Sequence, residues 1–306
     1  MTNLDYSQNT HHKVVNYFSE HLFENLTLTD VKRFLASEKI SYEEFESVFL
    51  AKKLALISGE NIFLNFEHRF IRTLKKARDL YLIETLPPSV RGEIVFVSHN
   101  MLTKMKDDIS TILLIGSAAR GKLRASSDLD FFVILNRALG RDLLGHNKKS
   151  RIELQFSTRI GFGRLFRDRD ELALWALKYG LIIYDDDYVF DYYLPSELQV
   201  GEKTVIKKRR MIQRLIDDIS DSPNATEKRI RHKLTRLIFQ MARYILILND
   251  ELPLSRSELP DQLMEYAPEL AKKISEFESK PVSDRDELLR CFYEFRSLYD
   301  RELMQS

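Results

Sequence analysis

The chain has 306 residues, of which 44% are apolar and 30% charged, and its formal net charge is +1. This length suits about two domains, and the composition is that of a globular protein rather than a disordered or fibrous one. No apolar run reaches the roughly 20 residues of a membrane span, and the single cysteine excludes a disulfide framework and a cysteine-rich zinc site. The first residues lack the apolar core of a signal peptide, so a cytoplasmic protein is expected.

Residues 1–66 are expected to form a small unit of three helices followed by a hairpin. The helices are predicted at residues 14–23, 28–35 and about 42–54. Thr29–Asp30 is the expected cap of the second helix, and Ser41–Glu44 forms a capping box for the third. Apolar stretches on both sides of Ser58–Asn61 indicate the hairpin. This order resembles a winged helix, but the third helix is rich in glutamate, which favours docking or oligomerisation over sequence-specific DNA binding.

A charged helical linker is predicted over residues 67–88, where Pro87–Pro88 interrupts the chain. Residues 89–107 are expected to form a helix that leads into the first central strand. The segment EIVFV at 93–97 could instead be a strand, and its periodicity leaves both interpretations open.

The most informative stretch, ILLIGSAARGKLRASSDLDFFVIL, covers residues 112–135. The apolar runs at its two ends indicate buried strands. Asp128 and Asp130 stand two residues apart at the head of the second strand, so both carboxylates project from one face while Leu129 enters the core. Two adjacent carboxylates repel each other, and a divalent cation such as Mg²⁺ relieves that repulsion.

Gly116 and Ser117 follow the first of these strands and open a short helix. Glycine allows a ligand to approach the backbone closely, and the free N–H groups of a helix start favour phosphate. The Ser117 hydroxyl adds a further donor. The stretch therefore predicts a phosphate cradle beside a metal site, a combination that suits phosphoryl or nucleotidyl transfer.

This pattern resembles the signature of minimal nucleotidyltransferases of the DNA polymerase β superfamily. The matching residues are Gly116, Ser117, Arg120, Gly121, Ser127, Asp128 and Asp130. The resemblance implies an α+β fold, with a core of a mixed sheet and helices. It also implies transfer of a nucleoside monophosphate from a nucleoside triphosphate to an acceptor hydroxyl, with release of pyrophosphate. ATP is the expected substrate and one or two Mg²⁺ ions the expected cofactor. The residues expected to bind the nucleotide are Gly116, Ser117, Arg120, Lys122 and Ser127.

A third carboxylate is predicted on the next strand, RIELQFST at 151–158, which alternates apolar and polar residues. Glu153 and Gln155 share its polar face. Families of this superfamily often carry a further carboxylate on this strand, and Glu153 matches that place. Asp128, Asp130 and Glu153 are thus the expected catalytic and metal-binding residues, with Glu153 also able to serve as general base.

A helix is predicted at residues 168–179 and a strand directly after it, an order similar to the end of the transferase domain in these families. The three carboxylates of Asp185–Asp187 come next, and the family pattern gives them no metal role. They are predicted to form a solvated turn. Trp175 lies among leucines and is predicted to be core rather than a base-stacking platform.

From about residue 200 the chain is predicted to form a helical bundle. The expected helices are at residues 205–219, 226–248, 255–264, 268–277 and 284–304. Two basic runs, Lys207–Arg210 and Lys228–Lys233, could meet the phosphates of an RNA or tRNA acceptor, could hold the triphosphate, or could be solvated helix faces. In the last case Asp217–Asp218 would pair with the first run and Glu227 with the second.

The predicted division is a winged-helix-like domain at 1–66, a helical linker at 67–88, a nucleotidyltransferase domain at 89–200 and a C-terminal helical bundle at 201–306. The acceptor is left open among RNA, a protein side chain and a small molecule, as is homo-oligomerisation. Two alternatives from other classes also remain: a winged-helix DNA-binding regulator and a toxin–antitoxin component. The filled carboxylate positions argue against the regulator.

Overall fold

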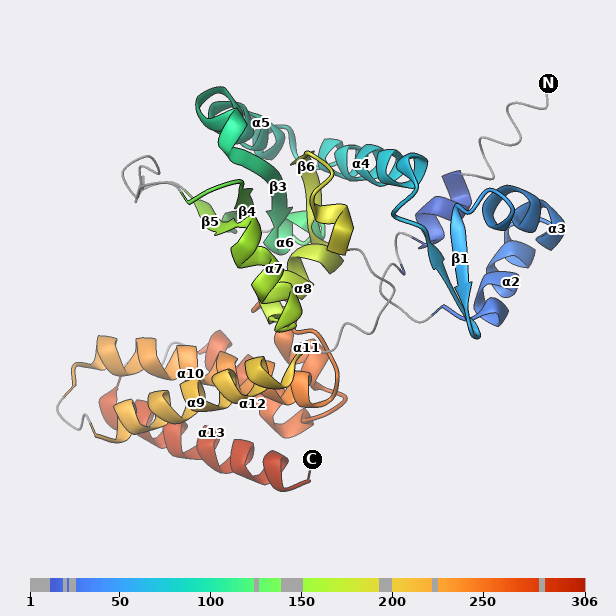
Figure 1. Ribbon diagram of the computed structural model, residues 1–306. Coiled ribbons are helices and arrows are strands. Elements are labelled where there is room, and N and C mark those ends of the chain that lie inside the picture. The colour runs from blue at the N-terminus through green and yellow to red at the C-terminus, as the bar shows by residue number, and fades with distance from the viewer. Residues whose placement is uncertain are drawn as a thin grey trace. The chain divides into compact units, whose positions relative to one another are not determined.

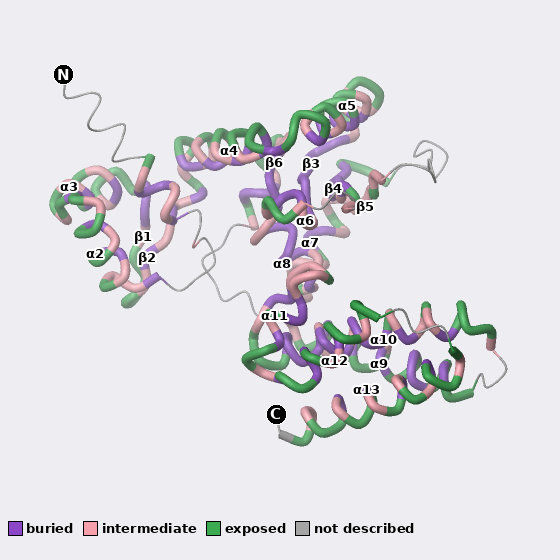
Figure 2. Tube along the Cα trace, turned by 180° about the vertical axis from the view of Figure 1, so that it is seen from behind, coloured by how far each residue is buried: buried purple, intermediate pink, exposed green. Residues whose placement is uncertain are grey.

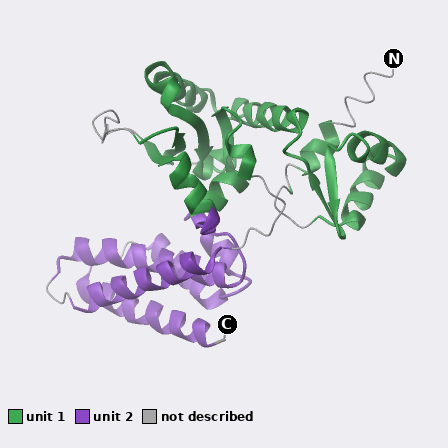
Figure 3. Cartoon of the chain, viewed as in Figure 1, with its two compact units in different colours: residues 1–166, 172–198 green, residues 167–171, 199–306 purple. Residues whose placement is uncertain are grey.

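The computed structural model describes residues 12–18, 21, 26–123, 127–138, 151–192, 200–221, 225–280 and 284–305. The chain divides into two compact units (Figure 3). The first comprises residues 1–166 and 172–198, and the second comprises residues 167–171 and 199–306. Among the described helices, none combines the length and the apolar content needed to cross a membrane.

The N-terminal part of the first unit has helices followed by a hairpin, in the predicted order (Figure 1). Residues 12–18 are helical, and residues 19–20 and 22–23 of the predicted first helix lie outside the described part. The next elements are α2 (Leu28–Ser37), α3 (Tyr42–Phe45), a π-helical turn at Glu46–Leu50, β1 (Ala55–Ser58) and β2 (Asn61–Leu64). The third helical segment was predicted to reach Leu54. It ends at Leu50, because the chain turns there and Lys53 takes a positive φ of 54°.

The caps of these helices are local side-chain hydrogen bonds. The Thr27 hydroxyl accepts a hydrogen bond from the Asp30 amide at 3.2 Å, and the Asp30 carboxylate accepts one from the Thr27 amide at 3.1 Å. The predicted cap at Thr29 was therefore two residues too late, since this reciprocal pair starts the helix. Ser41 caps α3 as predicted, with its hydroxyl accepting from the Glu44 amide at 3.0 Å.

Two long helices, α4 (Arg69–Glu84) and α5 (Pro88–Met105), precede the main sheet. The segment EIVFV lies within α5 and is not a strand. Ile94 and Val97 are buried, whereas Val95 and Phe96 are 63% and 67% exposed. This separation of buried and exposed side chains follows the helical period, so the tertiary contacts of one face settle the ambiguity.

The main sheet is mixed, with strand order β5-β4-β3-β6. Its strands are β3 (Ile109–Ile115), β4 (Leu129–Leu135), β5 (Ile152–Thr158) and β6 (Leu181–Asp185). The central strand β3 is antiparallel to β4 and β6, while β4 and β5 run parallel. Figure 2 shows β3 and β4 as the buried centre of this unit. The mixed α+β architecture that the resemblance implied is confirmed.

The two faces of the sheet are covered by different helices. Buried residues of α5, such as Ile94, join one hydrophobic cluster with Phe131 and Val133 of β4. Phe132, which the pleat places on the other face, packs against Phe162 of α7 with ring centroids 5.9 Å apart. The alternation along β4 therefore determines which of its residues face α5 and which face α7.

The helix predicted at residues 168–179 is shorter, and a further helix comes before it. The helices are α7 (Arg159–Arg167) and α8 (Glu171–Tyr179). A turn with Arg169 at a positive φ of 49° separates them. Two glycines within 159–167 lower helix propensity and hid α7 from the sequence pattern. The Thr158 hydroxyl, which accepts a hydrogen bond from the Gly161 amide at 3.0 Å, was the local signal of its start.

The second unit is helical in all its described secondary structure. Its helices are α9 (Glu202–Ser220), α10 (Glu227–Leu248), α11 (Leu259–Leu263), α12 (Pro268–Ser279) and α13 (Arg285–Gln305). They lie close to the predicted ranges, because the apolar residues recur at helical spacing. One hydrophobic cluster draws residues from all five helices, and α10 contributes the most.

The residues of the first basic run do not all face the same side of α9. Lys208 is 7% exposed, and its ammonium group lies 2.5 Å from Glu171, which Arg243 also contacts. The expected partners differ as well. Asp217 accepts a hydrogen bond from Gln213, and Asp218 pairs with a lysine of the second run. The helical period turns neighbouring basic residues to different sides of α9.

Candidate active site

Three carboxylates gather at one end of β4 and β5. Asp128 directly precedes β4, Asp130 is the second residue of β4, and Glu153 is the second residue of β5. Asp130 and Glu153 are register partners in the parallel pair. Asp128 shares their face because it lies two residues before Asp130, and Leu129 between them is fully buried. The strand register therefore places the three predicted residues together.

No cationic side chain of the described residues pairs with these carboxylates. Asp128 and Glu153 are exposed and Asp130 is half-buried. Within the described ranges, no hydrogen bond or ion pair reaches any of the three. Burial, together with repulsion from Glu153 and from Asp128, raises the pKa of Asp130 to about 6. The site thus holds more negative charge than the described part of the chain neutralises.

Arg151 is the cation nearest in sequence to this group, but its side chain pairs with another residue, Glu93. Its guanidinium donates two hydrogen bonds to Glu93 of α5, at 2.8 and 2.5 Å. These bonds raise the pKa of Arg151, and the Asp128 carboxylate adds to the rise. The Arg151 carbonyl also accepts the Leu129 amide at 2.7 Å. Sequence reasoning missed this residue, since its partner lies 58 residues away in the chain.

Gly116 lies against the Asp130 carboxylate, directly after the end of β3. It takes a positive φ of 77° and directly follows Ile115, the register partner of Asp130. A Cβ atom at this position would overlap Oδ2 of Asp130 and lie 3.0 Å from its Cγ. Only glycine satisfies both the backbone conformation and this close approach.

Ser117 lies in the single turn α6 (Gly116–Ala119) that follows. Its carbonyl accepts the Arg120 amide at 3.3 Å and the Lys122 amide at 2.9 Å, which closes the turn. Its hydroxyl makes no hydrogen bond in the part of the chain that the structure describes, and so stays available to a ligand. Lys122 is exposed, and Ser127 is half-buried beside Asp128.

Arg120 has a structural contact of its own. Its guanidinium lies 5.5 Å from the ring centroid of Trp175 and 5.7 Å from that of Tyr179, both on α8. Trp175 is buried, as predicted for a core residue. Arg120 therefore packs on aromatic side chains of α8.

The carboxylates suit Mg²⁺ by their chemistry. Carboxylate oxygens are the hard ligands that this ion prefers, and a bound cation would offset both the burial and the neighbouring charges that raise the pKa of Asp130. Among the described residues, no three His, Cys, Asp or Glu side chains are arranged to hold a metal ion by themselves. Because Mg²⁺ is usually bound through one or two carboxylates, several waters and substrate phosphates, the group fits an ion that binds together with a nucleotide.

The other acidic stretch, Asp185–Asp187, was predicted to be a solvated turn, and this was wrong for Asp185, which is the half-buried last residue of β6, whereas Asp186 and Asp187 are exposed. Asp185 accepts a hydrogen bond from the Thr111 hydroxyl at 2.6 Å. Asp186 accepts one from Ser110 at 2.8 Å and pairs with Arg159. Burial raises the pKa of Asp185, and its hydrogen bonds oppose that rise. These carboxylates hold β3, β6 and α7 together.

Comparison with known proteins points to the same part of the chain. Residues 99–188 match the family model described as polymerase beta, nucleotidyltransferase. A solved structure of a nucleotidyltransferase-like protein from Exiguobacterium sibiricum 255-15 is similar over 68% of this chain and 74% of that one, at 14% identity and a TM-score of 0.37. No curated protein sequence matches. The matched residues include the glycine turn and all three carboxylates, so the similarity to nucleotidyltransferases covers the candidate site.

Proposed function

We propose that the chain is a Mg²⁺-dependent nucleotidyltransferase that transfers AMP from ATP to an acceptor hydroxyl and releases pyrophosphate. The observation that carries this proposal is the group of three carboxylates beside Gly116, which no ion pair with a described residue neutralises. A purely structural role would leave its repulsion unrelieved. The match of residues 99–188 to the nucleotidyltransferase model supports the reaction class.

The roles follow from position and chemistry. Asp128 and Asp130 would hold Mg²⁺, which supplies neutralisation of the triphosphate charge when it is bound. The backbone at Gly116 and the hydroxyl of Ser117 would hold the terminal phosphates, with Lys122 adding positive charge.

Glu153 would accept the proton of the acceptor hydroxyl as its oxygen attacks the α-phosphorus in line. The bond from that phosphorus to the bridging oxygen of the β-phosphate breaks, and pyrophosphate leaves with the electron pair.

Asp130 contributes in a second way. Its carboxylate rests directly on Gly116, so the metal-binding and phosphate-binding parts of the site share one contact. A ligand held at Gly116 is therefore held at a fixed place relative to Asp130. Such positioning of reacting groups accounts for a large part of catalysis in phosphoryl-transfer enzymes.

The test is a label-transfer experiment. The purified chain is incubated with each α-³²P-labelled nucleoside triphosphate, Mg²⁺ and a lysate separated into RNA, protein and small-molecule fractions. Label from ATP in one fraction, lost with EDTA and with the Asp128→Asn variant, is the expected result. It would name the nucleotide and the acceptor class together.

The opposite result favours a different class of protein. A chain that neither transfers label nor binds any triphosphate would fit the winged-helix regulator, whose helix and hairpin order residues 28–64 follow. Label transfer that persists in Asp128→Asn would contradict the assignment of the site.

A further inference from the structure

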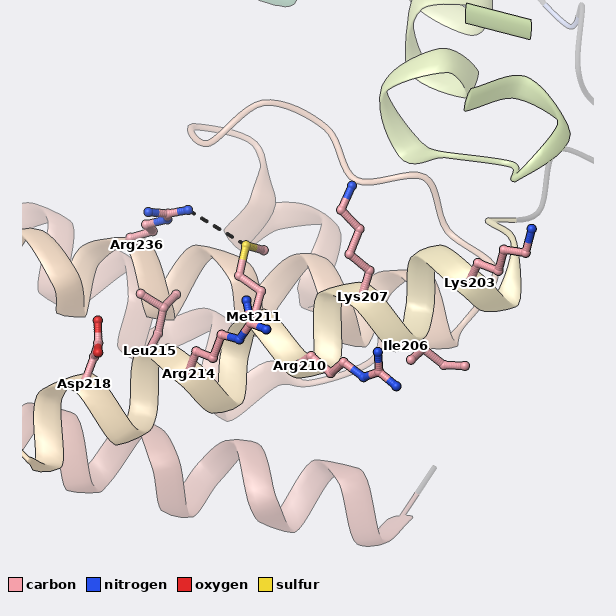
Figure 4. Close-up of a pocket in the computed structure, with 9 residues that line it drawn as sticks. All are labelled: Lys203, Ile206, Lys207, Arg210, Met211, Arg214, Leu215, Asp218 and Arg236. Carbon is pink, nitrogen blue, oxygen red and sulfur yellow. Dashed lines mark hydrogen bonds between the residues drawn. The ribbon is translucent and has the colours of Figure 1, made fainter. Parts of the chain in front are cut away.

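A cationic groove lies on the helical unit, along α9 (Figure 4). Its volume is about 780 Å³. Five basic side chains line it: Lys203, Lys207, Arg210, Arg214 and Arg236. The single acidic residue in its lining is Asp218, and this carboxylate already pairs with Lys233 at 3.2 Å. The groove is therefore strongly positive.

Much of this charge is available to a ligand. Arg210 and Arg214 form no ion pair with any residue in the described ranges. Lys203 and Lys207 contact Asp168 and Asp170, at 2.7 and 3.8 Å. Both lysine side chains nevertheless remain about 80% exposed, at 80% and 78%, so these pairs are solvated and weak.

The spacing of the cations suits an extended anion. Lys203, Lys207, Arg210 and Arg214 recur every three or four residues, so they share one face of α9. At about 1.5 Å rise per residue the row extends for about 16 Å. Figure 4 shows their side chains leaving successive turns of the helix. A row of this length can meet several successive phosphates, whereas one triphosphate would use only part of it.

The groove also has apolar surface between its charges. Ile206 is 41% exposed, and Met211 and Leu215 line the same hollow. The Arg236 guanidinium lies 3.9 Å from the Met211 sulfur on the opposite side. Single-stranded nucleic acids bind where cations follow the backbone while bases lie on apolar side chains or on arginine planes. A duplex would present only its backbone and leave this apolar surface unused.

We propose that this groove binds the phosphodiester backbone of a single-stranded polynucleotide, with its bases against Ile206 and Met211. The binding does not depend on the transferase activity. The further statement that the bound strand is the acceptor of the transferred nucleotide rests on the proposed function.

The test measures binding by the full chain without any nucleoside triphosphate. Fluorescence anisotropy would follow a labelled single-stranded RNA of about 16 nucleotides, the same sequence as DNA, and the RNA duplex. The groove variant carries Arg210→Glu and Arg214→Glu. A control with the same change in charge carries Lys272→Glu and Arg290→Glu, which are exposed positions outside the groove lining.

Wild type and control should bind a single strand more tightly than the duplex, and the groove variant should bind at least about tenfold more weakly. Its slope of log affinity against log salt should fall by about 2, since two phosphate contacts are lost. A preference for RNA over DNA would identify which polynucleotide is bound. Equal unfolding temperatures of the two variants ensure that folding is not the cause.

Three results would overturn the proposal: no single-strand binding by the wild type, equal losses in both variants, or complete competition by free ATP at equal phosphate concentration. The outcome for the transferase is separate. If Asp130→Asn binds RNA like the wild type while label transfer is absent in the wild type too, the groove stands and the proposed function fails.

Discussion

Two groups of three acidic residues stand at opposite ends of the main sheet, and they are held in opposite ways. Asp130 faces Ile115 at the end of β3, whereas Asp185 faces Thr111 near its beginning. Each residue of Asp185–Asp187 has a donor or cation of the protein: Thr111, Ser110 with Arg159, and Lys76. In the other group, by contrast, the carboxylates of Asp128 and Glu153 repel that of Asp130.

Whether the protein neutralises an acidic group distinguishes a structural group from a ligand-binding one better than amino-acid composition does. Both groups lie at the ends of apolar strands, and both include a half-buried aspartate with a raised pKa. In Asp185 hydrogen bonds oppose the effect of burial, while in Asp130 neighbouring carboxylates add to it. A group that the protein does not neutralise is one that a ligand is expected to neutralise.

The largest expected effect is on catalysis. Asp128→Asn and Asp130→Asn should each lower nucleotidyl transfer by about 10³-fold or more, because each removes charge that stabilises the transition state. Asp186→Asn at the other end of the sheet is the matched control, and its rate should stay within a few-fold of wild type. Steady-state label transfer measures both. Similar losses of transfer rate in Asp186→Asn and in the two site variants would contradict the assignment of catalysis to one acidic group.

The second prediction concerns the contact between Gly116 and Asp130. Gly116→Ala should lower transfer by about 10²-fold, because the new Cβ displaces the carboxylate. Gly121→Ala is the control, since Gly121 also has a positive φ, of 66°, but has no atom within 4 Å of its Cβ position. Both variants share the backbone strain, so a difference in rate reports the contact alone. Equal rates would place the loss in backbone strain.

The third prediction concerns stability, for which the larger effect is expected at Asp186 and the smaller at Asp128. Asp186→Ala leaves Arg159 and Ser110 without their carboxylate and should lower the free energy of unfolding by about 1–3 kcal/mol. Asp128→Ala removes no hydrogen bond or ion pair with a residue that the structure describes and should leave the free energy of unfolding nearly unchanged. Urea unfolding of the two variants beside wild type gives both values. A larger loss for Asp128→Ala would show that its carboxylate has a structural partner.

The smallest effect is a dependence of stability on pH. Asp130 keeps its proton up to a pKa of about 6 in the folded chain, against an ordinary value of 3.8. Between these values the folded chain binds more protons than the unfolded chain, so stability falls as pH rises through this window. Asp130→Asn should therefore melt a few degrees above wild type at pH 7.5 and level with it below pH of about 4.

Mg²⁺ with nucleotide supplies the control for that prediction. Bound cation offsets the charge of Asp130, so it should stabilise wild type and narrow the gap to Asp130→Asn. Thermal unfolding followed by circular dichroism, with and without the ion and ATP, measures the change. A variant that melts below wild type at every pH would mean that the ionised Asp130 stabilises the fold.

Local signals in the sequence were sufficient for much of the architecture. The two strands around Gly116, the alternation of β5 and the five helices of the second unit follow from periodicity, which depends only on neighbouring residues. α7 and the exact start of α2 were missed, because glycines weakened one pattern and Thr27 provided an earlier cap than Thr29. EIVFV could be assigned to α5 only through the core that its buried face contacts.

The candidate site shows the same division. The sequence by itself determined that Asp128 and Asp130 share a face, since a strand repeats every two residues, and alternation along β5 with the family resemblance pointed to Glu153. Only the tertiary structure decided which charges are neutralised. Arg159 reaches Asp186 and Glu171 reaches Lys208 across long stretches of chain. Pairing of charges depends on distances in space, and these arise from packing rather than from the order of neighbours.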